Sequence, residues 1–376
     1  MKRKVYFLTI LTLSLVISSY GQIKNGFEIN NGVNISHWLS QSGDRQPLDV
    51  VKAFFTREDV AYIASLGFDH IRIPIDEQRM FTVDGEKVPE AFALLHNALG
   101  WCNEFNLRAI VDLHVLRSHT FTGPESGRSL FTNPKAQEQF YEYWRKISGE
   151  LNKYSVDKVA YEPMNEPVAP DPETWNNILL SCVEAIRKLE PNRTIILGPN
   201  QWNGYNNAKY LRIPANDPNF IISFHFYTPM LLSHYRAGWT NDPGLANLAV
   251  PVHYPGQLIA DADMDSLSNS IAKQGQMVYN INVLENELMS IIDVGKKYNI
   301  PINCGEYGII SNAPDADKNR WFRDLYTIFE RHRISRTNWD YKSSDFGMVR
   351  LISSRNGVAG DVEPQTGMIN AILGKN

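Results

Sequence analysis

Two glutamates, Glu166 and Glu306, each follow a short apolar run of the chain. Glu166 closes Val-Ala-Tyr-Glu-Pro-Met-Asn-Glu (159–166), and Pro167 behind it has no N–H group with which to continue a central strand. The carboxyl end of a barrel strand is where such folds place catalytic groups. Cleavage of a glycosidic bond requires one carboxyl group that protonates the leaving oxygen and another that attacks or activates water. The pair therefore predicts a glycoside hydrolase site.

Other apolar runs also end in hydrogen-bonding side chains, and buried polar groups are costly unless they are paired. We expect Arg72 and Tyr227 to hold one of the two glutamates ionised and to lower its pKa, while the other keeps the proton. An aromatic face at a strand end suits the apolar face of a sugar ring. The polar and aromatic residues at strand ends, besides the two glutamates, are Arg72, Asp76, Glu77, Asp112, His114, Asn165, His225, Tyr227 and Trp339.

The elements that must position these residues alternate in type along the chain. Apolar runs typical of strands alternate with helix-like segments, which predicts parallel strands joined by crossover helices and favours an α/β, (β/α)8 TIM barrel as a single domain. An open doubly wound sheet would require a glycine-rich turn after the first strand, where the chain has Ser36, His37 and Trp38. The predicted strands are 32–36, 68–75, 108–115, 159–166, 193–199, 221–227, 301–308 and 336–341. The predicted helices are 56–66, 89–105, 133–154, 172–189, 267–298, 315–332 and 365–373.

Long connections at 116–132 and 228–264 are expected to build a substrate cleft at the carboxyl end of the strands. Five aromatic residues near strand ends are candidates for this cleft, and each is equally consistent with ordinary packing: Trp38, Trp202, Tyr205, Tyr235 and Trp239. Trp101, Trp144 and Trp321 lie in predicted helices and are expected in the outer core.

The composition indicates a globular protein without a nucleic-acid surface. The chain has 376 residues, 43% of them hydrophobic, and a net charge of -4 with no block of like charges. Residues 1–21 combine a basic start, an apolar run and the small residues Ser19 and Gly21, an order that predicts a signal peptide rather than a buried helix or a membrane span. We therefore expect a monomeric catalytic domain over 22–376, secreted or periplasmic.

Three cysteines cannot form a complete disulfide framework, and we expect all three to be packing residues. Strand parity predicts that Cys304 faces the same side as Glu306, one layer deeper. The segment 261–265 imitates the start of a calcium loop, but Ser266 and Ala272 stand where glycine and glutamate are required. We expect no metal and no cofactor.

From residue 32 to residue 342 the chain resembles family 5 glycoside hydrolases. The family's strand-two arginine matches Arg72, its strand-three histidine matches His114, and its Asn-Glu-Pro matches residues 165–167. Its His-x-Tyr, strand-seven glutamate and strand-eight tryptophan match residues 225–227, Glu306 and Trp339. Two positions depart from the pattern. Val115 stands where many members have a second histidine, with His119 further along, and His37 stands where glycine is common.

The resemblance implies a retaining mechanism with Glu166 as acid/base, Glu306 as nucleophile and Asn165 beside the sugar 2-hydroxyl. Substrate-binding or supporting roles are also expected at Trp38, His37 and Trp239. The expected substrate is a β-linked, glucose-containing polysaccharide, most simply cleaved as an endo-β-1,4-glucanase. Mannanase, xyloglucanase and exo-glucanase activities remain alternatives. A metal-dependent barrel hydrolase is a weaker alternative, because this chain has no His-x-His on its first strand. A barrel that only binds sugar is also weaker, because both glutamates are intact.

Overall fold

The computed structural model describes residues 23–375 except for 43–45, 123, 125–126, 241, 261–263, 266, 353, 356–357 and 360–361. The predicted signal peptide and most of the calcium-like segment 261–265 lie outside the described residues.

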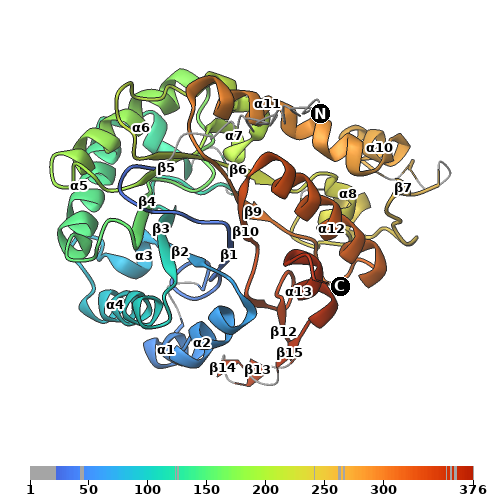
Figure 1. The fold of residues 1–376 in the computed structure, drawn as a ribbon, viewed down its shortest axis with the longest axis horizontal. Helices are drawn as coiled ribbons and strands as arrows, with labels where there is room; N and C mark the ends of the chain where they lie inside the picture. The colour runs from blue at the N-terminus through green and yellow to red at the C-terminus, as the bar shows by residue number, and fades with distance from the viewer. Residues whose placement is uncertain are drawn as a thin grey trace, which may run out of the picture.

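Eight parallel strands close into a barrel at the centre of the molecule (Figure 1). Around the barrel the order is β1, β10, β9, β6, β5, β4, β3 and β2, so successive barrel strands pair with one another and the last strand, β10, closes the barrel on β1. The predicted (β/α)8 architecture is confirmed. The strands are β1 (Asn31–Asn34), β2 (His70–Asp76), β3 (Arg108–Val115), β4 (Val159–Glu162), β5 (Ile195–Leu197), β6 (Phe220–Phe226), β9 (Ile302–Tyr307) and β10 (Ser335–Asn338).

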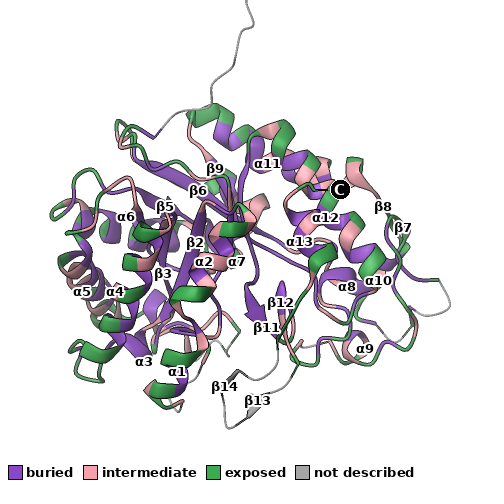
Figure 2. Ribbon diagram, turned by 60° about the horizontal axis from the view of Figure 1, so that its bottom comes forward, coloured by how far each residue is buried: buried purple, intermediate pink, exposed green. Residues whose placement is uncertain are grey.

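Helices surround the barrel, and the strands they cover are buried (Figure 2). Two of the helices begin with capping side chains: Thr56 and Asp59 form a capping box at α2, and Asp171 accepts from two backbone N–H groups of α6. The α-helices are α1 (Leu48–Phe54), α2 (Arg57–Leu66), α3 (Glu77–Met80), α4 (Pro89–Glu104), α5 (Pro134–Leu151), α6 (Pro172–Arg187), α7 (Asn200–Asn203), α8 (Met230–Ser233), α9 (Pro243–Ala246), α10 (Asn269–Gln276), α11 (Ile281–Tyr298), α12 (Asp315–His332) and α13 (Thr366–Ile372).

Shorter elements lie in the connections. Two are 3-10 turns, η2 (Ser129–Phe131) and η3 (Tyr205–Tyr210). Three small sheets pair β7 (Gly256–Gln257) with β8 (Val278–Tyr279), β12 (Val349–Leu351) with β11 (Lys342–Ser343) and β15 (Val362–Pro364), and β13 (Ser354–Arg355) with β14 (Val358–Ala359).

The barrel interior changes from apolar to polar along its axis. Ile110, Ala160, Ile196 and Ile221 come from the starts of four strands and form a buried layer on which Phe27 packs. Because side chains alternate along a strand, residues two and four positions further on point into the same interior. On β3 and β6 those positions carry Asp112, His114 and His225, three of the polar groups predicted for the site, so the apolar layer closes one end of the barrel and supports the site at the other.

Several predicted elements are shorter than expected, and two of them differ in an instructive way. β4 ends at Glu162, so Asn165 and Glu166 lie in the connection beyond the strand. The predicted helix 267–298 is two helices, because Val278 and Tyr279 pair with β7 and Asn280 then caps α11 through the N–H groups of Asn282 and Val283. That cap shows why a new helix begins there.

The predicted orientation of Cys304 is wrong. Cys304 belongs with Ile302 and Tyr307 to the buried cluster that includes the outer helices. The register between β6 and β9 shifts at this point, since Phe224 pairs with Cys304 but His225 pairs with Glu306. The extra residue turns Glu306 inward, so simple parity fails. All three cysteines are buried and unpaired, as packing residues are.

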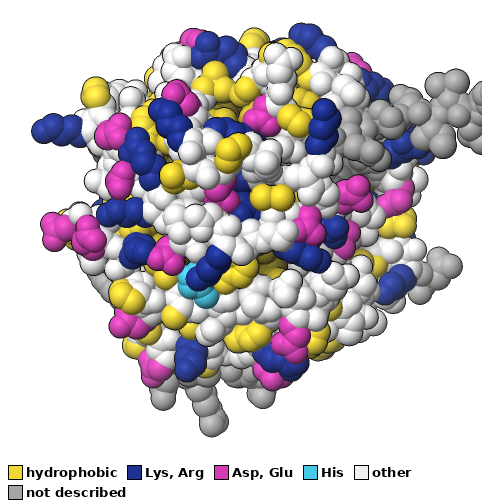
Figure 3. All heavy atoms as spheres, turned by 60° about the vertical axis from the view of Figure 1, so that its left-hand side comes forward, with side chains coloured by type: hydrophobic (Ala, Val, Ile, Leu, Met, Phe, Trp, Pro, Cys, Tyr) yellow, Lys and Arg dark blue, Asp and Glu magenta, His cyan; other side chains and the backbone are white. Residues whose placement is uncertain are grey.

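Charged side chains of both signs are interspersed over the face in Figure 3. Within the described part of the chain, no helix has the length and apolar character that a bilayer crossing requires.

Candidate active site

A fully buried arginine, Arg72 of β2, organises the polar end of the barrel. Its guanidinium nitrogens lie within 3.2 Å of oxygen atoms on five side chains from four other strands or the connections that follow them. Bidentate and multiple contacts of this kind suit the planar donor fork of arginine. The partners are Asn34, Asp112, Glu162, Asn165 and Glu306.

The carboxyl groups around Arg72 outnumber its single charge. Burial raises the pKa of Asp112 to about 7 and raises the pKa of Glu162, although Arg72 opposes both effects. An excess of buried carboxyl groups over cations favours retention of protons in the site. The site therefore favours a carboxyl group that stays protonated, as a general acid must be before it reacts.

Glu306 has the support that the sequence predicted. Its Oε1 accepts from Arg72 Nη1 at 2.9 Å, and its Oε2 accepts from the Tyr227 hydroxyl at 3.0 Å. Burial nevertheless raises the pKa of Glu306 to about 8, against the lowering effects of Arg72 and Tyr227. The predicted fall in pKa is therefore wrong in sign, because removal from water outweighs the two contacts.

Glu166 receives less stabilisation of its ionised form. Its Oε1 lies 2.8 Å from His225 Nδ1, and burial together with the charge of Glu306 raises the pKa of Glu166 well above its ordinary value. Its backbone is left-handed, with φ of 45°. The two glutamates therefore differ in how well their ionised forms are stabilised, as the sequence predicts. Glu306 contacts a cation and a hydroxyl donor, whereas Glu166 is the carboxyl group that more readily keeps its proton.

His119 lies close to the active site, although Val115 occupies the position where many family members have a second histidine. It is buried, and its Nε2 lies 3.1 Å from the backbone oxygen of Glu166. Burial lowers the pKa of His119 to about 4, so the ring is neutral and donates from Nε2. His119 therefore supports the backbone of Glu166 from the loop after β3.

Three further predicted residues lie in the same cluster. Asn165 accepts from Arg72 through Oδ1, and its buried Nδ2 has no partner among the described residues, which leaves a donor free for a substrate. His114 Nδ1 lies 2.7 Å from Asp112, and the His114 ring stacks on Trp339 with centroids 5.6 Å apart and planes at 6°. One face of Trp339 is therefore already covered.

Two residues from the first connection behave differently. His37 is partly exposed. Burial lowers its pKa, but the hydrogen bond and charge of Asp340, together with the charges of Asp345 and Asp76, raise it, so the pKa rises overall. Trp38 is fully buried, donates from Nε1 to the Val51 oxygen and packs on Phe55. Of the two alternatives predicted for Trp38, ordinary packing fits the structure and an open position in the cleft does not, because the connection folds back on α1 and covers the ring.

The remaining candidate aromatics divide by exposure. Trp239 and Trp202 are 53% and 45% exposed, whereas Tyr235 is 3% exposed and donates to the Val250 oxygen. The Trp239 ring lies 6.3 Å from Phe346, which in turn lies 6.1 Å from the Tyr227 ring. Trp239 is thus the outer end of an aromatic row that begins at a residue contacting Glu306.

Sequence reasoning missed Glu162, Asn34 and Asn203. Glu162 follows inward-facing Ala160 by two residues, so strand alternation could have identified it. Asn34 likewise follows Gly32 by two residues on β1. Asn203 lies beyond β5 in a left-handed turn, which no sequence signal indicated.

Among the described residues, one group of potential metal-binding side chains comes together: atoms of Glu166, His225 and Glu306 lie within 4.8 Å of one another. His225 Nδ1 lies 2.8 Å from Glu166 Oε1 and 3.5 Å from Glu306 Oε2, so both carboxyl groups gather around one imidazole. The carboxyl pair matches acid–base chemistry.

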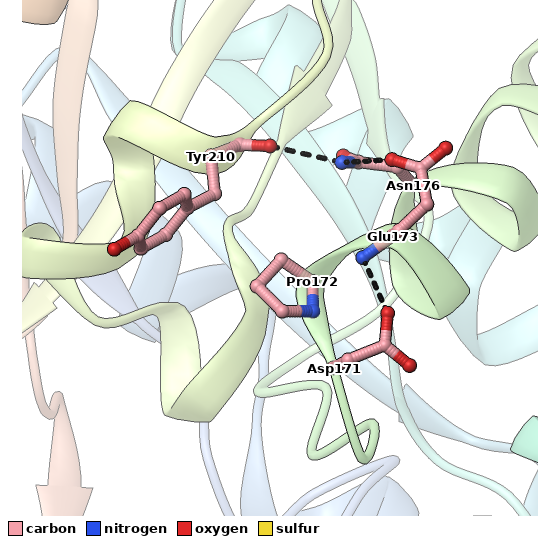
Figure 4. Close-up of a pocket in the computed structure, with 5 residues that line it drawn as sticks. All are labelled: Asp171, Pro172, Glu173, Asn176 and Tyr210. Atoms are coloured by element: carbon pink, nitrogen blue, oxygen red, sulfur yellow. Dashed lines mark hydrogen bonds between the residues drawn. The ribbon is translucent and has the colours of Figure 1, made fainter.

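A separate pocket of about 470 Å³ lies at the start of α6 (Figure 4). It is lined by Asp171, Pro172, Glu173, Asn176 and Tyr210, and Asn176 donates to the Tyr210 oxygen at 2.9 Å. None of the five is a predicted site residue, so this pocket does not belong to the cluster around Arg72.

Comparison with known proteins agrees with this geometry. Endoglucanase C of Acetivibrio thermocellus is 29% identical over 324 residues, which cover 84% of this chain and 92% of that protein. Cellodextrinase A of Ruminococcus flavefaciens is 28% identical over 82% of this chain and 84% of its own length. The structure of Thermotoga maritima Cel5A in complex with mannotriose superposes with a TM-score of 0.73 at 20% identity, covering 93% of this chain and 99% of that one, and shows the same fold.

The family described as Cellulase (glycosyl hydrolase family 5) matches residues 26–345, which is most of the chain. This range contains the barrel, both glutamates and every residue that contacts Arg72. The chain belongs to glycosyl hydrolase family 5 and is a glycoside hydrolase.

Proposed function

We propose that this protein is a secreted, retaining endo-β-1,4-glucanase that uses Glu166 as acid/base and Glu306 as nucleophile. The observation that carries the proposal is the closeness of the two carboxyl groups: one oxygen of each lies within 4.8 Å of the other and of a ring nitrogen of His225. Retaining enzymes hold their carboxyl groups about 5–5.5 Å apart, whereas inverting enzymes need about 6.5–9.5 Å to admit water. The short separation supports direct attack by a carboxylate.

The unequal surroundings of the pair support the division of roles. In the first step a Glu306 oxygen bonds to the anomeric carbon while Glu166 delivers its proton to the glycosidic oxygen, and the bond between that oxygen and the carbon breaks. In the second step ionised Glu166 accepts a proton from water. The hydroxide so formed displaces Glu306 from the anomeric carbon, and the β-configuration returns. Arg72 and Tyr227 orient Glu306 throughout.

The relatives and the exposed aromatic residues support a polymeric β-glucan as substrate. The two relatives described above are named as an endoglucanase and a cellodextrinase. Trp202 and Trp239 present exposed rings on connections after β5 and β6, where a chain longer than two sugars can lie. β-Mannan is the second candidate, because the similar Cel5A fold was solved with mannotriose.

Product analysis tests the mechanism and the substrate together. Proton NMR immediately after cleavage of a β-1,4-glucan should show the β-anomer first, with the α-anomer appearing only by mutarotation. Glu306→Ala should abolish turnover and leave oligosaccharide binding intact. Initial α-anomer, or undiminished activity of Glu306→Ala on β-glucans and β-mannans alike, would refute the proposal. A panel of glucan, mannan and xyloglucan would rank the substrates.

Secretion rests on residues 1–21 and is tested separately. Expression of the full chain with its native amino terminus should give an extracellular or periplasmic product whose first residue is Gln22. A product retaining Met1 in the cytoplasmic fraction would contradict the proposed export without affecting the enzymatic assignment.

A further inference from the structure

Asn203 is a buried side chain between two groups of the active site, and it does not contact either catalytic glutamate in the hydrogen-bond network described above. Its Nδ2 lies 3.4 Å from Glu162 Oε1 and 3.3 Å from His225 Nε2. Glu162 is held by Arg72 through both carboxylate oxygens, so Oε1 acts as an acceptor. The group of Asn203 that faces Glu162 must therefore be the NH2 group rather than the carbonyl oxygen.

The same NH2 group faces His225. Because it can only donate, His225 Nε2 must accept, and Nε2 therefore carries no proton. Burial, followed by the charges of Arg72 and His114, lowers the pKa of His225 well below its ordinary value, so the ring is neutral. A neutral imidazole has one N–H, which is then at Nδ1. That nitrogen lies 2.8 Å from Glu166 Oε1 and 3.5 Å from Glu306 Oε2.

An unusual backbone conformation and a neighbouring glycine fix the position of the Asn203 side chain. Gln201, Trp202 and Asn203 have consecutive left-handed φ angles of 59°, 57° and 50°. Such angles are uncommon outside glycine, and strained segments persist where surrounding structure fixes them. A Cβ atom at Gly198 would lie 2.6 Å from Asn203 Oδ1, so only glycine leaves room for the amide there.

We propose that Asn203 is a positioning residue that holds His225 in the Nδ1–H tautomer and thereby fixes which oxygen of Glu166 delivers the proton. Since His225 donates to Oε1, the acid proton of Glu166 is placed on Oε2. When Glu166 has given up this proton, the Nδ1–H group stabilises the carboxylate through a charge-assisted hydrogen bond. The inference rests on the proposed role of Glu166 as acid/base.

The tautomer can be measured in the wild-type protein without any assay of activity. Nitrogen-15 NMR of the imidazole groups at neutral pH should show His225 protonated at Nδ1 and bare at Nε2, with the resonance assigned by its absence in His225→Gln. A proton on Nε2, or an imidazolium, would overturn the proposal. This readout stays valid even if the catalytic roles of Glu166 and Glu306 are wrong, so the two failures are distinguishable.

Asn203→Gly tests the consequence for catalysis, because glycine accepts the left-handed backbone and removes only the amide. We expect the Nδ1–H preference to weaken. The kcat on substrates with poor leaving groups should fall at least about tenfold, since general acid catalysis contributes about 10²–10⁴-fold. Activated aryl glycosides should lose far less. Asn216→Gly is the matched control, because Asn216 is also left-handed, with φ of 67°, but is exposed in the loop before β6.

An equal loss on both substrate types, or an unchanged tautomer with unchanged kcat, would overturn the positioning role. The pH dependence of kcat provides a second test. The titratable and charged groups that face His225 are Arg72, His114, Glu166 and Glu306. Loss of the Nδ1–H donor should move the basic limb of the profile on poor leaving groups upward, because ionised Glu166 is then less stabilised. A purely structural role for Asn203 would not move this limb.

Discussion

Arg72 Nη1 lies 2.9 Å from Glu306 Oε1, and neither side chain has more than slight access to solvent. The contact joins the proposed nucleophile to the one cation that also holds Asp112 and Glu162. Since several buried carboxyl groups depend on a single guanidinium, we expect Arg72 to contribute to the stability of the barrel as well as to the proposed chemistry at its end.

Arg72→Ala should therefore destabilise the protein strongly. Removal of one partner from a buried ion pair costs about 3–5 kcal/mol, because the remaining charge is left buried and unpaired. Thermal unfolding monitored by circular dichroism should show a large fall in Tm, and Arg72→Lys should not restore it, because an ammonium cannot reproduce the fork of contacts. Arg57→Ala is the control: Arg57 pairs with Glu104 at the surface, and its loss should change Tm little.

Glu306→Gln should change how stability depends on pH. The pKa of Glu306 is raised to about 8 by burial, so the folded state binds a proton more tightly than the unfolded chain does. Its contribution to stability is present in full below the ordinary glutamate pKa and is lost as pH rises towards about 8. Glutamine cannot ionise, so it does not suffer this loss.

The Tm of Glu306→Gln minus that of the wild type should be small near pH 4 and positive near pH 8. Differential scanning calorimetry across this interval measures it. Glu287→Gln serves as control, because Glu287 lies on α11 and contacts Tyr205 away from Arg72. A difference that shrinks as pH rises would show that Arg72 and Tyr227 outweigh burial.

Much of the site follows from the sequence because polar residues stand out where apolar runs end. The apolar runs and the motifs beside them place Arg72, His114, His225 and Glu306 at strand ends, and the structure brings all four together. The fold followed for the same reason, since apolar runs and helical segments alternate over the whole chain.

Other features depend on contacts that no local pattern carries. The bulge before Glu306 follows from the register of β6 against β9, and it reversed the predicted direction of Cys304. Trp38 is buried because the connection after β1 packs on α1, which is a tertiary contact. Asn203 reaches His225 only through a left-handed turn whose residues have ordinary side chains.

Trp239→Ala should weaken action on polymers more than on short substrates. Trp239 is 53% exposed at the outer end of an aromatic row, so it can stack on a sugar distant from the cleaved bond. Loss of an aromatic contact worth about 0.5–1.5 kcal/mol predicts a decrease in kcat/KM of about two- to tenfold on polymeric glucan. An aryl cellobioside should be hydrolysed at nearly the normal rate. Tyr298→Ala removes an exposed ring at the end of α11 and should affect neither substrate.

Glu166→Ala should separate two classes of substrate. A poor leaving group needs the proton that Glu166 supplies, so kcat/KM on unsubstituted glucan should fall by about 10²–10⁴-fold. An aryl glycoside with an acidic phenol leaves without that proton, so formation of the glycosyl-enzyme should be largely preserved. Hydrolysis of the glycosyl-enzyme then lacks a base, and a burst of phenol followed by slow turnover is expected in stopped-flow absorbance.

Added azide should accelerate the slow phase, because azide attacks the glycosyl-enzyme without needing a base. Equal losses on both substrates, with no burst and no effect of azide, would remove Glu166 from the acid/base role and leave its hydrogen bond to His225 as a structural contact.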